Sequence, residues 1–172
     1  LVKVNQTSVV SGDLVDWRDL DPQFDVSQDE ALVIGGTLEL GIENVVLVGG
    51  SFEVASTPSQ MLKLGDAGAV TGALLTLTLT DVNLFVGTGA VFDGTTHGLI
   101  VRDGDETGFY VGAADLRYAA LTTASGDVYT GIYFTAATVT IDGFDGFALA
   151  VYDLLVKVNQ TSVVSGDLVD WR

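Results

Sequence analysis

The residues of this sequence best suited to chemistry are carboxylates that gather in glycine-containing turns. The clearest group is DGDETG, which contains Asp103, Asp105 and Glu106. Calcium binds several oxygen ligands in a flexible geometry, and turn carboxylates together with backbone carbonyls can supply them. This group is therefore a candidate calcium site, and calcium is the only cofactor that the sequence suggests. The group matches neither the EF-hand loop nor the nonapeptide of calcium β-rolls, so plain solvated turns remain the alternative.

Paired carboxylates also act as acid and base in glycoside hydrolysis, which makes a carbohydrate-cleaving site the enzyme hypothesis. The sequence has one histidine, His97, in the stretch GTTHGL. No nucleophile–base pair, phosphate-binding loop or dinucleotide fingerprint accompanies it. We therefore expect no catalytic residues and no enzyme activity.

One segment of the chain occurs twice. LVKVNQTSVVSGDLVDWR forms residues 1–18 and returns unchanged as residues 155–172. Old duplications drift apart, so perfect identity indicates either a very recent copy or a unit that is repeated without change. We expect residues 1–154 to be one full repeat unit and residues 155–172 to be the start of the next. An engineered duplication or a permutation overlap is the alternative.

Four residues of the two copies are candidates for the junction between repeats: Asn5, Trp17, Asn159 and Trp171. A tryptophan at the same place in successive units suits an anchor, although a core position explains it equally well. Because identical segments should meet equivalent neighbours, we expect similar backbones in both copies. In a solenoid, translation along one axis by about 24–29 Å should relate them.

The composition excludes several classes of partner. The formal net charge is −16, with 23 acidic and 7 basic residues. Such a chain repels nucleic acid and anionic lipid surfaces. The absence of cysteine excludes disulfides and zinc–thiolate sites. No apolar run of about 18 residues occurs, so we expect no membrane span in this segment. The acidity and the absence of cysteine favour an extracellular or cell-surface location.

The elements that must position these residues are β-strands. The chain has 21 glycines and 2 prolines, and apolar and polar residues alternate in many stretches. In residues 75–80, for example, three leucines alternate with three threonines, which places them on opposite faces of a strand. A strand followed by a glycine turn recurs at irregular spacing. This pattern predicts an all-β fold, a parallel β-solenoid (β-helix) repeat unit. The alternative is a β-sandwich bead of a tandem array.

The stretch 72–172 resembles repeats of giant tandem-repeat surface proteins of bacteria. The resemblance depends on V-x-x-F-V-G-x-G around Phe85–Gly89, on the tyrosine–leucine stretch Tyr118–Thr122, and on the V-x-V-N strand Val156–Asn159. It implies an extracellular, adhesin-like or filament-forming role and carries over no catalytic residues.

These observations predict a structural repeat of a long extracellular fibre or adhesin stalk. Stacking of identical units would set its length and stiffness, and its partners would be adjacent identical repeats in the same chain or filament. A carbohydrate-binding or carbohydrate-cleaving β-helix domain is the alternative function.

Overall fold

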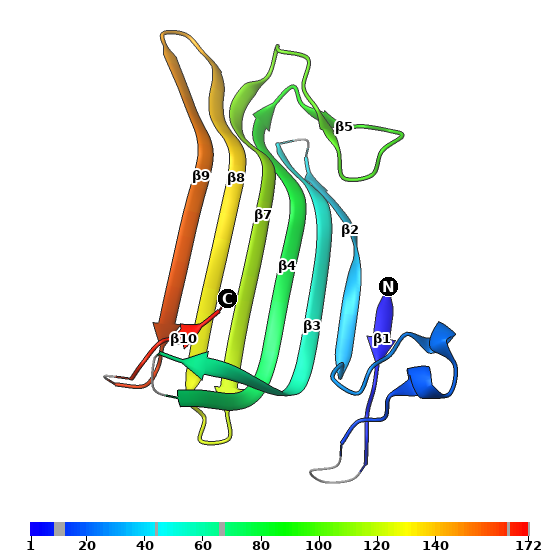
Figure 1. The fold of residues 1–172 in the computed structure, drawn as a ribbon. Coiled ribbons are helices and arrows are strands. Elements are labelled where there is room, and N and C mark those ends of the chain that lie inside the picture. Colours follow the sequence, from blue (N-terminus) through cyan, green and yellow to red (C-terminus); the bar gives the residue numbers. More distant parts are fainter. Residues whose placement is uncertain (9–12, 44, 66–67, 165, 172) are drawn as a thin grey trace.

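The computed structural model describes residues 1–8, 13–43, 45–65, 68–164 and 166–171, and most of them lie in β-strands (Figure 1). The strands are β1 (Val2–Val4), β2 (Leu32–Ile42), β3 (Val46–Leu64), β4 (Gly68–Thr88), β5 (Val91–Phe92), β6 (Ile100–Val101), β7 (Thr107–Thr123), β8 (Val128–Phe144), β9 (Phe147–Thr161) and β10 (Val169–Asp170). Two 3-10 helices, η1 (Trp17–Asp19) and η2 (Pro22–Phe24), lie between β1 and β2. The prediction of an all-β fold is confirmed.

The main sheet is an antiparallel meander with the order β1-β2-β3-β4-β7-β8-β9. Strand β10 pairs with β3, and β5 and β6 form a separate hairpin. The prediction of a parallel β-solenoid is wrong. Strands β8 and β9 are joined through Asp145 and Gly146 alone, with Phe144 paired to Phe147. So short a connection can join only antiparallel strands, because a parallel crossover needs a dozen or more residues.

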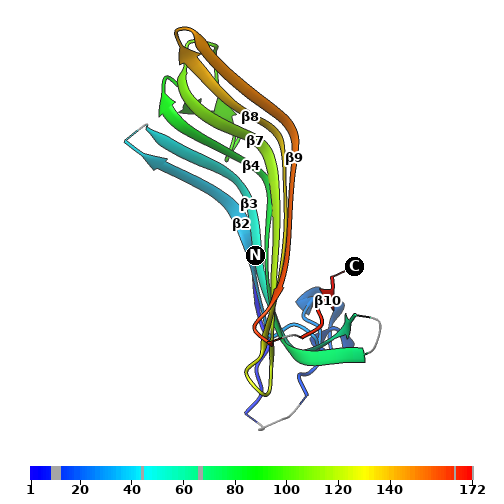
Figure 2. The ribbon, with the colours of Figure 1, turned by 90° about the vertical axis from the view of Figure 1, so that its left-hand side faces the viewer.

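Buried apolar side chains gather at the two ends of the sheet. At one end, Leu47 and Phe85 pack with Ala90, which precedes β5, and with Ile100, which begins β6. At the other end, β3 and β4 curl over, and β10 contributes Val169 to a second cluster (Figure 2). The molecule therefore has two layers at its ends and one layer between them. This antiparallel arrangement fits the alternative expectation, a β-sandwich bead, better than a solenoid.

The long strands bend together near their middle, as Figure 2 shows from the side. Three residues near this level have left-handed backbone angles: Asp81 (φ 51°), Ala113 (φ 47°) and Asp153 (φ 52°). The β3–β4 and β4–β7 registers also shift here, between Gly49 and Ser51 and between Leu79 and Val82. Bulges of this kind bend a strand and increase its twist. The bend is therefore built into the backbone of several strands.

The middle of the sheet has one apolar and one more polar face, as the alternating leucines and threonines of β4 predicted. One row of paired residues crosses the meander from β1 to β9 on the apolar face: Val2, Ile34, Val54, Leu77, Tyr118, Ile132 and Val158. The neighbouring row on the other face includes Lys3, Thr76 and Asn159. The second face carries the polar residues of the candidate site described next.

Candidate functional site

The two copies of the repeated segment lie at opposite edges of the main sheet (Figure 1). The first copy contains β1, and the second supplies residues 155–161 of β9. Six antiparallel pairings separate the two strands, so they run in the same direction. At a strand spacing of about 4.8 Å, the separation across the sheet is about 29 Å. The expected relation along a solenoid axis is wrong, because the two strands are related across one antiparallel sheet.

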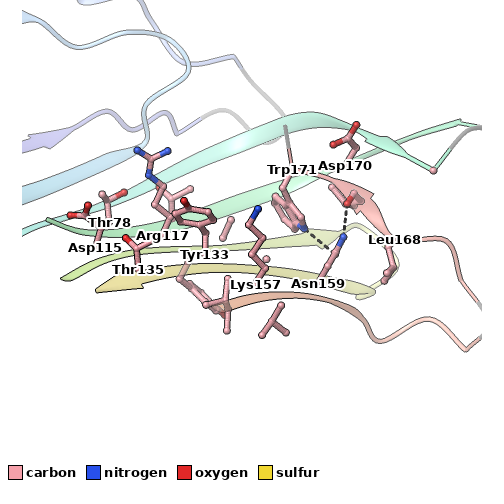
Figure 3. A pocket seen from close by; sticks show the side chains of 18 residues that line it. Thr78, Asp115, Arg117, Tyr133, Thr135, Lys157, Asn159, Leu168, Asp170 and Trp171 are labelled. Carbon is pink, nitrogen blue, oxygen red and sulfur yellow. Dashed lines mark hydrogen bonds between the residues drawn. The ribbon is translucent and has the colours of Figure 1, made fainter. Parts of the chain in front are cut away.

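Each copy closes on itself through the same pair of hydrogen bonds. In the first copy, Asn5 Nδ2 donates to the Val15 carbonyl at 2.7 Å, and Trp17 Nε1 donates to Asn5 Oδ1 at 3.1 Å. In the second copy, Asn159 Nδ2 donates to the Val169 carbonyl at 2.8 Å, and Trp171 Nε1 donates to Asn159 Oδ1 at 3.1 Å (Figure 3).

We call this arrangement the Asn–Trp clamp. The four asparagine and tryptophan residues of the two clamps were predicted to form a junction between repeats, and the structure pairs them within each copy. Residues 9–12, 165 and 172 of the two copies lie outside the described residues. The clamp bonds are the same in both copies, but the expectation of similar backbones holds only in part, because Trp17 begins η1 whereas Val169–Asp170 form β10.

The first clamp is covered by the segment that follows it. Asn5 Nδ2 also donates to the Ser27 carbonyl at 3.0 Å, and Asn5 is only 3% exposed. Lys3 Nζ lies 2.7 Å from Asp25 Oδ2 and 3.8 Å from Glu30 Oε1. The hydrogen bond between Lys3 and Asp25 raises the pKa of Lys3 and lowers the pKa of Asp25. Two Asx caps, from Asp16 and Asp21, begin the 3-10 helices of this segment.

At the second clamp, no described residue takes the place of Asp25, Ser27 or Glu30, although the sequence of the clamp is the same. Among the described residues, Lys157 makes no ion pair, and its ammonium group lies 5.5 Å from the centre of the Tyr133 ring. Asn159 is exposed. Around these residues an open groove of about 1120 Å³ crosses the polar face, and Figure 3 shows Arg117, Tyr133 and Trp171 along it. Lys157 and Asn159 are thus available to a partner.

The structure does not gather the predicted calcium ligands into a cation site. Asp103 Oδ1 accepts a hydrogen bond from the Asp105 amide at 3.2 Å, and Glu106 Oε2 accepts one from the Gly104 amide at 3.1 Å. Within the described part of the chain, no three acidic or histidine side chains converge as metal ligands. Glu106 is buried, and its Oε1 has no hydrogen-bond partner among the residues that the structure describes. This geometry favours the alternative of solvated turns for Asp103 and Asp105, which are exposed, but not for Glu106.

The single histidine of the sequence lies at the surface beside one carboxylate. His97 is 88% exposed in its side chain, and its Nδ1 lies 3.6 Å from Glu39 Oε2. Sequence reasoning missed the partners of the first copy, namely Asp25 and Glu30 for Lys3 and the Ser27 carbonyl for Asn5. The available signal was their position, since these residues lie within twelve residues of the end of the repeated segment.

No family model matches this sequence, and no match was found among curated proteins or solved structures. In the part of the chain that the structure describes, no helix is long and apolar enough to cross a membrane.

Proposed function

We propose that this chain is a structural repeat of a long fibre or adhesin stalk, in which adjacent identical units set length and stiffness. The observation that carries the proposal is the placement of the two identical segments. They lie at opposite edges of one sheet, run in the same direction and form the same Asn–Trp clamp. A translation can therefore bring the end of one unit onto the start of the next, as a linear array requires. This role needs no catalysis.

The shape of the sheet supports a stiff role. Figure 2 shows that the strands bend together, so the sheet has an angled cross-section instead of a flat one. An angled plate resists flexing better than a flat plate of the same thickness. The bend also lies at bulges in several strands, which makes it a fixed feature of the backbone.

Chains of one, two and four repeats test this proposal through small-angle X-ray scattering. A stiff array should lengthen by a constant increment for each added unit, about 29 Å if units join across the sheet. Flexibly linked beads should instead extend with roughly the square root of their number. The second result would contradict the proposal.

We place this array outside the cell or at its surface. The acidity of the chain and its lack of cysteine support the location. Protease added to intact cells that make the native protein should then cleave it as fast as in a lysate. Full protection in intact cells would contradict the location.

A carbohydrate-binding role is the second candidate, and the groove on the polar face favours it. Tyr133 and Trp171 offer aromatic surfaces there, and Arg117 and Lys157 offer positive charge. An acidic polysaccharide would suit these groups. Titration with such a polysaccharide should shift the tryptophan fluorescence, and an Arg117→Ala, Lys157→Ala variant should lose the response. No response in the unmodified chain would exclude this candidate.

A further inference from the structure

The backbone of the repeated strand bonds to different neighbours in its two copies. In the first copy, Leu1 and Gly35 exchange both of their hydrogen bonds, at 2.7 and 2.9 Å, and the Asn5 amide donates to the Ala31 carbonyl at 3.0 Å. Alternate residues of an antiparallel strand point to the same neighbour. Lys3, which pairs with Val33, therefore also directs its amide and carbonyl toward β2.

In the second copy the other set of residues is used. The Ser162 amide donates to the Val128 carbonyl at 2.8 Å, and Val158 pairs with Ile132 in the same register. By the same alternation, Val156, Val158 and Gln160 bond to β8. The amides and carbonyls of Leu155, Lys157 and Asn159 therefore point outward, and β9 has no further neighbour among the described strands.

We propose that, between two units, one copy of the repeated strand uses both sets of backbone groups at once, one set bonding to β8 of its own unit and the other to β2 of the next. Adjacent units then form a single continuous antiparallel sheet. The free edge of β9 would bind β2 of the next identical unit, in the register that β1 has with β2 here. The partner surface is thus a second copy of this sequence, whether it follows in the same chain or belongs to another. This inference depends on the proposed tandem array and adds the way in which its units join.

The lengths of the two strands fit this junction. Leu1 faces Gly35, so continuing the register upstream places Leu154 of one unit opposite Gly36 of the next. The same count places Ala148 opposite Ile42, where β2 ends, and β9 begins one residue earlier at Phe147. The whole uncovered edge of β2 would therefore be paired.

The bend of the sheet would also continue across the junction. The same register places Asp153, the left-handed residue of β9, opposite Thr37. Thr37 pairs with Ser51, at the register shift of β3. Two units joined in this way bend at the same level. A junction whose register is shifted by several residues would place the bends of the two units at different levels.

The side chains left open at the second copy match what the next unit would bring. Lys157 corresponds to Lys3, so Asp25 and Glu30 of the next unit would meet its ammonium group as they meet Lys3. Asn159 corresponds to Asn5 and would gain the Ser27 carbonyl. Figure 2 places the segment after β1 and the segment after β9 on the same side of the sheet, as this exchange requires.

Amide hydrogen exchange in a two-unit chain, residues 1–172 followed by a second copy of residues 19–172, tests the junction. Compared with the single unit, the Lys157 and Asn159 amides should exchange at least about tenfold more slowly, because they gain hydrogen-bond partners. Val158, already bonded to β8, is the internal control and should change little.

The outcomes separate this inference from the function on which it depends. If the two-unit chain is stiff but Lys157 and Asn159 exchange as fast as in the single unit, the continuous sheet is wrong and the stalk role stands. If the two units tumble independently and both amides stay fast, the inference and the proposed function are both wrong.

A pair of proline variants gives a second readout. Lys157→Pro removes an outward amide, whereas Val158→Pro removes an amide bonded to β8. Lys157→Pro should therefore uncouple the units of the two-unit chain while the single unit keeps most of its stability. Val158→Pro should destabilise both chains, and Lys157→Ala controls for the lost side chain. Equal loss of stability from Lys157→Pro in both chains would also overturn the inference.

Discussion

Trp171 Nε1 donates a hydrogen bond to Asn159 Oδ1 at 3.1 Å, and Trp17 makes the same bond to Asn5 at the same distance. The two clamps share these bonds but differ in their surroundings, because Val15 is 56% exposed whereas Val169 is 1% exposed and belongs to β10, which pairs with β3. Asn5 is buried under the Ser27 carbonyl, and Asn159 is exposed. Identical sequences in two environments therefore provide matched comparisons within one molecule.

Removing the clamp asparagines should cost different amounts of stability. Asn159→Ala removes two hydrogen bonds of an exposed asparagine, one from the Trp171 indole and one to the Val169 carbonyl, for a loss of about 1 kcal/mol. Asn5→Ala removes three hydrogen bonds at a buried position and should cost about 2–3 kcal/mol. Urea unfolding measures both, with exposed Gln160→Ala as the control. Equal losses at the two positions would show that the cover over Asn5 adds nothing.

Acid should release the ion pair of the first copy. The pKa of Asp25 is lowered from its ordinary value of 3.8 by the hydrogen bond from Lys3. The pair therefore stabilises the fold above that ordinary value, and this stabilisation is lost as the pH falls through the lowered pKa. In Lys3→Met, an NMR titration should show the pKa of Asp25 rising toward 3.8. Lys157→Met is the control, and a similar rise there would contradict the assignment of the pair.

Gly131 on β8 makes room for the Trp171 ring. A Cβ atom at this position would lie 2.7 Å from Trp171 Cε2, which is closer than non-bonded carbon atoms approach each other. Gly131→Ala should therefore displace the ring, cost about 1–3 kcal/mol, and shift tryptophan fluorescence to the red in a Trp17→Phe background. Gly94→Ala adds its methyl group to open space and serves as the control. Unchanged fluorescence in Gly131→Ala would place Trp171 elsewhere.

The bend predicts opposite signs for two alanines of β7. Ala113 has a left-handed backbone, which costs an L-residue about 1–2 kcal/mol, whereas glycine adopts it without that cost. Ala113→Gly should therefore stabilise the protein by about 0.5 kcal/mol after the entropy cost of glycine. Ala119 has regular strand geometry, so Ala119→Gly should destabilise the protein. Thermal unfolding compares the two, and destabilisation by both would contradict a fixed bend at Ala113.

Much of the local structure could be predicted from the sequence because side-chain alternation is a local property. Leu77 and Thr78 lie on opposite faces of β4 as the alternation indicates. The direction of pairing could not be read in this way, because leucine rows stack equally well in parallel and antiparallel sheets. The Asp145–Gly146 dipeptide between apolar runs was the available signal for a hairpin, and it is where β8 turns into β9.

The candidate site was predictable only in part for a related reason. The identity of the two segments pointed to Asn5, Trp17 and their copies. The partners of Lys3 lie 22 and more residues further along the chain, where the path of the backbone decides which carboxylates return. The calcium expectation at Asp103 used spacing alone. In the structure, this carboxylate and that of Glu106 each accept a hydrogen bond from a nearby backbone amide.

Amide exchange in the single 172-residue chain tests the central claim most directly, because it compares one sequence with itself. If the two copies occupy opposite edges of one sheet, Lys3 should exchange more slowly than Val4 in the first copy. In the second copy the order should reverse, with Lys157 faster than Val158. The same order in both copies would contradict the account, since the repeated strand would then bond through the same edge at both ends of the unit.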